Sequence, residues 1–201
     1  MKAAWCVWPR QVVHRVVRRM RPNPSLHPHR YGRLRRPPRS GELKRQAAMN
    51  SLGPWTTEDF DSLAWHDVHV HGLRLTSFNE SHGSADLVLD IDYIMKWESS
   101  GNGFQFTLCP AELVFHGVFG LKVELDYATP TAGMCPFSIH AIEREPLAFP
   151  GGSKSFRWHI PINWPHGSLR FEAAGFRLTL VGTPVVHSRQ SLSPEQRTRA
   201  A

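Results

Sequence analysis

The sequence predicts a mainly all-β fold, an antiparallel β-sandwich or flattened barrel with one short N-terminal helical turn and a disordered basic leader. Two observations carry the β prediction. Short segments after residue 55 alternate apolar and polar residues with the period of a β-strand, and Gly, Pro, Asn and Ser separate these segments. No helical pattern of ten or more residues interrupts them.

Charge and composition change sharply near Met49. Residues 1–48 hold 13 Lys and Arg and one acidic residue, Glu42, whereas residues 49–201 hold 11 basic and 16 acidic residues. The formal charge of +7 therefore averages a segment at +12 and a segment at −5. The first segment also carries six prolines and little periodic apolar character, a composition that is typical of disorder.

Three interpretations of residues 1–48 stay open. The segment resembles an organellar presequence because it is rich in Arg and nearly free of acidic residues. It could also be an arm that binds nucleic acid or an anionic membrane. The third interpretation, which we favour, is that translation starts at Met49, so that residues 1–48 are absent from the native protein.

The folded part opens with the helical turn, and strands follow it. Thr56 or Thr57 is a candidate N-cap, with Glu58 and Asp59 near the positive end of the helix dipole. In residues 86–92, Leu87, Leu89 and Ile91 fall on one face of a strand and Asp86, Asp90 and Asp92 on the other, which predicts one buried and one solvated face. The connections are too short for parallel crossovers and favour hairpins. The predicted strands are Asp67–Phe78, Ala85–Lys96, Phe104–Cys109, Ala111–His116, Leu121–Tyr127, Phe137–Glu143, Phe156–Asn163, Ser168–Ala173 and Phe176–Val181.

These elements predict one antiparallel β domain over residues 55–186, followed by a polar tail over residues 187–201. In the tail, Ser193 and Pro194 are suited to begin a short helix as N-cap and first helical residue, with disorder as the alternative. The domain has two cysteines, Cys109 and Cys135, which are best interpreted as reduced apolar residues of a cytoplasmic protein, although a single bridge between them stays open. No apolar run approaches the roughly 18 residues that span a bilayer.

The segment W-H-D-V-H-V-H, residues 65–71, is the best candidate for a chemical site. If it is extended, Asp67, His69 and His71 project from one face, and two imidazoles two residues apart can converge on a divalent metal such as zinc. Asp90 and Asp92 on the next strand could add oxygen ligands. The alternative is that these residues form the solvated outer face of a half-buried strand.

Other chemistry finds less support in the sequence. There is no P-loop, no dinucleotide-binding fingerprint and no G-x-S-x-G nucleophile motif, so no cofactor is expected unless the histidines bind a metal. A domain with a charge of −5 repels nucleic acid. Nucleic-acid binding is therefore expected only if residues 1–48 belong to the protein.

Several segments resemble a family of small uncharacterised bacterial proteins. W-H-D-V-H-V-H-G and L-V-L-D-I-D-Y-I-M-K-W are similar to the opening of that family, and C-P-A-E-L-V-F-H, R-W-H-I-P-I-N-W, F-E-A-A-G-F and Q-S-L-S-P-E-Q-R are similar to its later segments. The resemblance covers most of residues 63–197 and none of residues 1–48, and it implies no known activity. The W-H-D opening is also similar to that of some immunity proteins of bacterial toxin systems.

We therefore predict a cytoplasmic bacterial β domain that binds a protein partner, with an immunity-like inhibitor as one form. Unpaired edge strands of an antiparallel sheet are suited to such recognition. The competing hypothesis is a metal-dependent enzyme built on Asp67, His69 and His71. Between the two, the sequence favours the role without catalysis.

Overall fold

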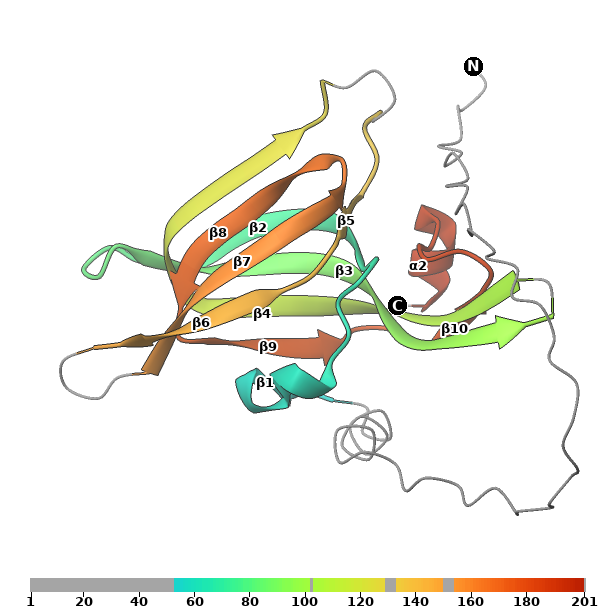
Figure 1. Cartoon of the computed structure of the whole chain (residues 1–201), viewed down its shortest axis with the longest axis horizontal. Helices are drawn as coiled ribbons and strands as arrows, with labels where there is room; N and C mark the ends of the chain where they lie inside the picture. The colour runs from blue at the N-terminus through green and yellow to red at the C-terminus, as the bar shows by residue number, and fades with distance from the viewer. Residues whose placement is uncertain (1–52, 102, 129–132, 150–153, 201) are drawn as a thin grey trace, which may run out of the picture.

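Long antiparallel strands make up most of the computed structural model, which describes residues 53–101, 103–128, 133–149 and 154–200. The strands belong to one ten-stranded sheet that turns back on itself (Figure 1). The predicted all-β, antiparallel fold is confirmed. The predictions for residues 1–48 lie outside the described residues.

The described residues contain ten strands, one 3-10 helix and one α-helix. Their bounds are β1 Trp55–Thr56, η1 Thr57–Ser62, β2 His69–Asn79, β3 Ser84–Ser100, β4 Gly103–Asp126, β5 Phe137–Ile139, β6 Glu143–Ala148, β7 Lys154–Trp164, β8 His166–Ala173, β9 Gly175–Leu180, β10 Val185–His187 and α2 Pro194–Ala200.

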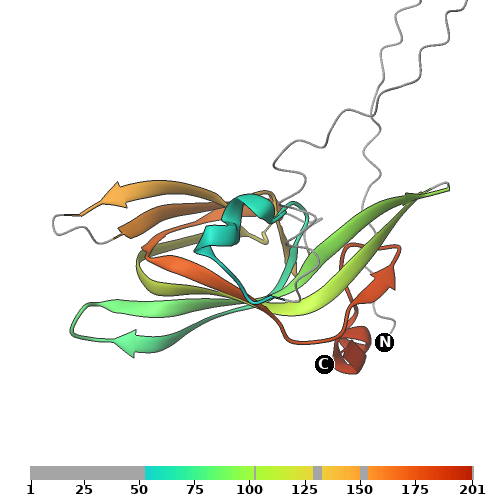
Figure 2. The ribbon, with the colours of Figure 1, turned by 90° about the horizontal axis from the view of Figure 1, so that it is seen from below.

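The sheet forms a flattened ring rather than a true barrel. Its strand order is β1-β9-β4-β3-β2-β5-β7-β6, and β8 pairs with both β4 and β7, so the path returns to β4. The register joins β2 to β5 only at His69 and Val70, which leaves the rest of that β2 edge outside the ring. Figure 2 shows the resulting layers, with the β2–β3 hairpin in one and β6 and β7 in the other.

A single strand, β4, replaces three of the predicted strands, because neither of the expected breaks occurs. Pro110 stays in the ladder opposite Asp92, and its carbonyl accepts a hydrogen bond of 2.9 Å from the Val181 amide. Gly117 and Gly120 have φ of 63° and 64°, values that glycine adopts without steric cost. The chain bends at these glycines without forming a hairpin, so β4 pairs with β9 before the bend and with β8 after it.

Two further differences concern short strands. The predicted strand Phe137–Glu143 is divided into β5 and β6, which both pair with β7. Between them Ile142 turns into the core, where it is 6% exposed, and this interrupts the ladder. The sequence also misses β1 and β10, which have two and three residues and are too short to show alternation.

The main core lies between the two layers. The predicted alternation in β3 is confirmed, since Leu87, Leu89 and Ile91 are fully buried. Across the core, Trp158 of β7 is also fully buried, and its ring lies 5.1 Å from the Phe115 ring of β4. The Trp158 indole N–H donates a 3.1 Å hydrogen bond to the Ala173 carbonyl, so its polar atom is satisfied inside the apolar core.

The predicted helical turn is confirmed as η1, and it bridges the two layers. The Asp59 carboxylate accepts a 2.9 Å hydrogen bond from the Thr56 amide, which stabilises the start of the turn. The Phe60 ring then packs edge-on against Trp158 of β7 at 5.6 Å and Phe176 of β9 at 6.2 Å. The Arg144 guanidinium covers Phe60 at 4.3 Å from the ring centre and shields this side of the core.

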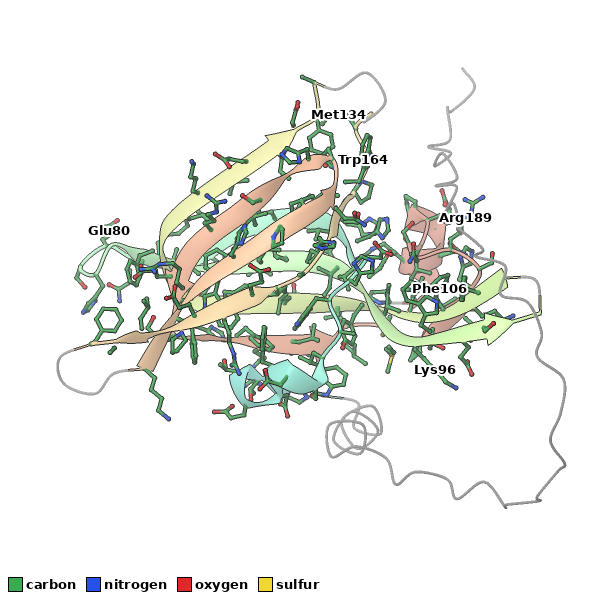
Figure 3. The ribbon with its side chains drawn as sticks, in the orientation of Figure 1. Glu80, Lys96, Phe106, Met134, Trp164 and Arg189 are labelled. Atoms are coloured by element: carbon green, nitrogen blue, oxygen red, sulfur yellow. The ribbon has the colours of Figure 1, made fainter. Side chains whose placement is uncertain are left out.

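The polar tail packs on the outer face of β3 and β4, outside the two layers of the sheet. The predicted helix is confirmed as α2, with a capping box in which Gln196 N–H donates to Ser193 Oγ at 3.3 Å and Ser193 N–H donates to Gln196 Oε1 at 2.8 Å. We call residues 185–200, which include β10 and α2, the C-terminal strap. It lies beside the projecting end of the β3–β4 hairpin, where Phe106 and Arg189 are labelled in Figure 3.

Neither of the helices in the described part of the chain has the length and apolar character of a membrane-spanning segment. Cys109 and Cys135, both within the described ranges, are not joined by a disulfide, and Cys109 donates instead to the Gly182 carbonyl at 3.1 Å.

Replacing Trp158 by alanine tests the position of the core. Trp158→Ala removes a fully buried ring and its hydrogen bond, so we expect a loss of about 3–5 kcal/mol in the free energy of unfolding. Urea denaturation at neutral pH measures this loss. Phe78→Ala is the matched control, because Phe78 is 71% exposed and its change is expected to stay within about 0.5 kcal/mol. Equal losses in both variants would contradict this assignment of the core.

Candidate functional site

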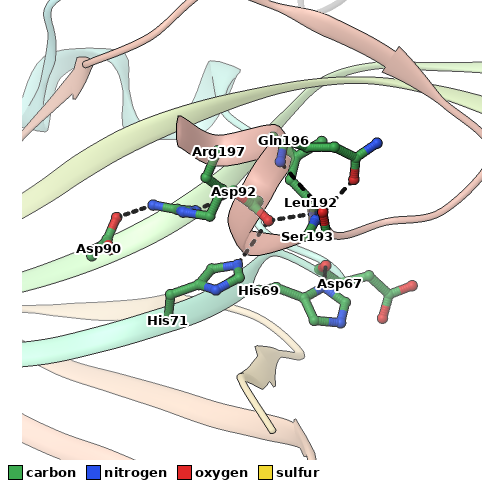
Figure 4. A network of polar contacts seen from close by, with 9 residues as sticks. All are labelled: Asp67, His69, His71, Asp90, Asp92, Leu192, Ser193, Gln196 and Arg197. Atoms are coloured by element: carbon green, nitrogen blue, oxygen red, sulfur yellow. Dashed lines mark hydrogen bonds and ion pairs between the residues drawn. The ribbon is translucent and has the colours of Figure 1, made fainter. Parts of the chain in front are cut away.

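A buried carboxylate, Asp92, organises the polar residues beneath the C-terminal strap. The alternation of β3 places Asp92 on the outer face of the sheet, yet it is fully buried because the strap covers it. The Leu192 amide donates a 2.7 Å hydrogen bond to Asp92 Oδ2, and an Arg197 guanidinium nitrogen donates to Asp92 Oδ1. Figure 4 shows Asp92 between these two strap residues and His71 of β2.

His71 and Asp90 complete this network. His71 Nε2 lies 2.8 Å from Asp92 Oδ2, and because an ionised carboxylate only accepts, the imidazole donates. The second guanidinium nitrogen of Arg197 donates to Asp90. Burial alone would raise the pKa of Asp92, but the hydrogen bond and charge of His71, the Leu192 amide and the charge of Arg197 outweigh it and lower that pKa. Asp92 is therefore held as a charged, fully paired carboxylate.

His69 differs from His71 in its surroundings. His69 is 8% exposed, and its Nδ1 lies 3.0 Å from the Asp67 carbonyl oxygen. A carbonyl can only accept, so Nδ1 carries the proton in the neutral ring. Burial lowers the pKa of His69 more than the Asp67 carbonyl and the charge of Asp92 raise it. The imidazole is therefore held neutral.

Asp67 precedes β2 rather than belonging to it. Its φ of 62° lies in the left-handed region, which Asp tolerates better than most residues. Its carboxylate accepts hydrogen bonds from Asn163 Nδ2 at 2.6 Å and from Gln190 Nε2 at 2.8 Å. This side chain therefore joins the start of β2 to β7 and to the strap.

Asp67, His69 and His71 lie close together (Figure 4), but each makes hydrogen bonds to other groups of the protein. β2 carries a register shift at His71, and this departs from the regular alternation that the metal hypothesis assumed for Asp67, His69 and His71. Within the described ranges, no group of three or more His, Cys, Asp or Glu side chains is arranged to hold a metal ion. Zinc binding by Asp67, His69 and His71 stays a prediction.

Sequence patterns do not predict four partners in this region, Asn163, Gln190, Leu192 and Arg197. They lie about 100 residues or more from the Asp residues they contact, except that Asn163 lies 96 residues from Asp67. No alternation links a polar tail to a particular strand. The one available signal is the capping pattern S-P-E-Q, which predicts the helix that carries Arg197 but not where it docks.

A second feature is an uncovered part of the inner face. Leu73 and Leu75 of β2 pair with Leu89 and Leu87 and therefore share the inner face with these fully buried residues. Even so, Leu73 is 37% and Leu75 is 40% exposed. Beyond Val70, β2 pairs only with β3 among the described residues, so its second edge has no strand to cover these side chains.

Leu75 also lines an apolar groove at the end of the β2–β3 hairpin. The groove holds about 290 Å³ between the hairpin and the bend of β4. Phe78, 71% exposed, and Phe119, 40% exposed, are its largest apolar side chains. Glu80, labelled in Figure 3, marks its outer end at the hairpin tip. We use the name apolar groove for the hollow lined by Leu75, Phe78, Asn79, Glu80, Gly83, Ser84, Ala85, Val118, Phe119, Gly120 and Leu121.

A larger hollow of about 600 Å³ lies over β4, β7 and β8, and most of its lining residues are charged or polar, among them Glu124, Asp126 and Arg170. Two of its lining groups have polar neighbours, since Glu124 pairs with Lys122 at 2.8 Å and His159 lies 3.0 Å from Glu143. Such pairs are typical of a solvated sheet face. The apolar groove is therefore the stronger candidate for a binding site.

Comparison with protein families, curated proteins and solved structures found no match to this chain.

Replacing Asp92 by asparagine tests the buried network. Asp92→Asn leaves Arg197 and His71 without their shared charge, and we expect a loss of about 3–5 kcal/mol in the free energy of unfolding at pH 7. The folded pKa of Asp92 lies below its ordinary value of 3.8, so its contribution is full above that value and is lost as the pH falls through the folded pKa. The free energy of unfolding of the variant should therefore fall less steeply than that of the native chain as the solution is acidified.

The control for Asp92→Asn is Glu98→Gln. Glu98 pairs with Lys96 at 2.8 Å, but both side chains are about half exposed, so its loss should cost about 1 kcal/mol or less. Urea titrations from pH 3 to pH 7 compare the three proteins. A cost for Asp92→Asn no larger than that of the control would contradict the role given to this carboxylate.

His69 generates a separate pH prediction. In the unfolded chain it gains a proton as the pH falls through about 6.5, whereas the folded chain resists protonation because burial lowers its pKa. The unfolded state then binds more protons, so the native chain should lose stability between pH 7 and pH 5. His69→Gln should lose less over the same range. Parallel stability curves for the two proteins would show that His69 is not held neutral.

Proposed function

We propose that this chain is a protein-binding module that accepts an extended segment of its partner along the free edge of β2 and the apolar groove. The observation that carries the proposal is the exposure of Leu73 and Leu75, inner-face residues beside a strand edge that pairs with nothing among the described residues. An apolar surface next to unpaired backbone groups is the requirement for strand addition.

The chemistry of the groove defines the partner segment. Backbone N–H and C=O groups of an added strand would pair with the β2 edge, while every second side chain would contact the leucines. An aromatic or branched apolar side chain would fit between Phe78 and Phe119. The charge of −5 over residues 49–201 favours a partner with a basic surface.

This proposal places the protein among binding modules rather than enzymes. An immunity-like inhibitor, which occupies a surface of another protein, is one form of such a module. We place it in the bacterial cytoplasm, where the two cysteines that are not joined to each other would stay reduced. The acidic domain disfavours nucleic acid as its ligand.

A library of random 12-residue peptides, displayed and selected against the full chain, tests the proposal. We expect the selected peptides to alternate apolar and polar residues and to lose affinity by about tenfold or more for Leu75→Glu. That substitution places a charge in the apolar contact, and the 40% exposure of Leu75 lets the variant fold. Fluorescence anisotropy of the labelled peptides measures the affinities.

Val186→Glu is the matched control. Val186 is an apolar strand residue, 63% exposed, that lies on β10 and not in the groove. It should leave peptide affinity unchanged. Selected peptides that bind Leu75→Glu as tightly as the native chain, or that are weakened equally by Val186→Glu, would overturn the proposal.

A further inference from the structure

The face beneath the C-terminal strap combines two kinds of contact in a small area. Asp90, Asp92 and Ile94 alternate along β3 and share one face, and the register sets Ile94 opposite Leu108 of β4. Phe106 is two residues from Leu108 in the same strand and lies on the same side. The surface is therefore acidic at one end and apolar at the other.

The strap supplies the complementary chemistry. Leu192 is 3% exposed and belongs to the same apolar cluster as Ile94, Phe106 and Leu108. Five residues later, the planar guanidinium of Arg197 donates to both Asp90 and Asp92, as Figure 4 shows. Arginine suits such a pair of carboxylates because its donors are fixed in one plane.

The strap is joined to the sheet by few backbone contacts. β10 pairs with β4 over three residues only. The helix end is held by the Thr183 amide, which donates to the Ala200 carbonyl at 2.6 Å. α2 has seven residues, and a helix this short is marginal without tertiary contacts. Release of residues 188–200 would leave the ladders of β2, β3, β4 and β10 intact and would return Asp92 to water.

We propose that the face formed by Asp90, Asp92, Ile94, Phe106 and Leu108 is a docking site for a short segment that carries a leucine followed by an arginine on a helix, and that residues 188–200 of the strap are its displaceable occupant. The occupant seen in the structure is this chain's own segment 188–200. The inference concerns the outer face of β3 and β4 and is independent of the apolar groove on the inner face.

A tethered occupant has a strong advantage over a free one. A segment attached through a short linker acts at an effective concentration on the order of millimolar. The native chain should therefore be closed to a free peptide of the same sequence. Weakening the strap should open the site to that peptide, provided that the face itself is unchanged.

The experiment uses full-length chains and a fluorescent peptide of residues 188–201. Arg197→Ala weakens the strap but keeps the face, and Leu192→Ala does the same without touching an ion pair. We expect both variants to bind the peptide at least about tenfold more tightly than the native chain. Adding Asp92→Asn to either variant, or placing Arg197→Ala in the peptide, should remove this gain.

Hydrogen exchange of the native chain supplies an independent measurement. The Leu192 and Arg197 amides, which donate to Asp92 and to the Ser193 carbonyl, should exchange at least about tenfold faster than the amides of the β3 ladder if the strap opens locally. Exchange of both sets at one common rate would overturn the proposal. So would folded Arg197→Ala and Leu192→Ala chains that bind the peptide no better than the native chain.

Discussion

The two-faced character of β3 is the constraint on which the rest of the structure depends. This strand pairs with β2 on one side and with β4 on the other, so its alternation decides what both faces of the layer must contact. Leu87, Leu89 and Ile91 require an apolar cover, which the second layer supplies around Trp158. The opposite face requires partners for carboxylates, and the strap supplies them.

Coverage of these two faces is uneven, and both proposed surfaces follow from that. On the inner face the ring is incomplete beyond Val70, so Leu73 and Leu75 stay accessible although their cross-strand neighbours are fully buried. On the outer face the cover is a segment with its own polar anchors. One surface lacks an occupant among the described residues, and the other holds an occupant that belongs to the same chain.

Much of this fold could be predicted from the sequence, because alternation reports burial directly. Residues 86–92 show which face of β3 is buried, and Ser193 with Gln196 marks the start of α2. The path of β4 could not be predicted, since Pro110 and Gly117 act as breaks in most local contexts. Here the strand continues because Pro110 stays paired with Asp92, and the residues before and after Gly117 stay paired with β3. Tertiary pairing decides such positions, and a single sequence does not contain it.

The candidate site could be predicted from the sequence less completely than the fold. The sequence identified Asp67, His69 and His71 by their spacing, with Asp90 and Asp92 as possible neighbours, and the structure does bring His71 to Asp92. It could not identify Arg197, because a lone arginine in a polar tail has the same local appearance whether it is solvated or inserted between two carboxylates. The difference lies entirely in the fold of the segment between them.

The chemistry of Asp92 explains why the strap docks in one register. A buried charge pair adds little net stability, because the cost of removing both ions from water offsets most of their attraction. A wrongly placed strap, however, would leave Asp92 buried without Arg197 or the Leu192 amide, which is strongly unfavourable. The apolar contacts of Leu192 favour association, and the carboxylate restricts that association to a segment with an arginine at the matching position. Selectivity on this face therefore comes from the acidic end, and affinity comes from the apolar end.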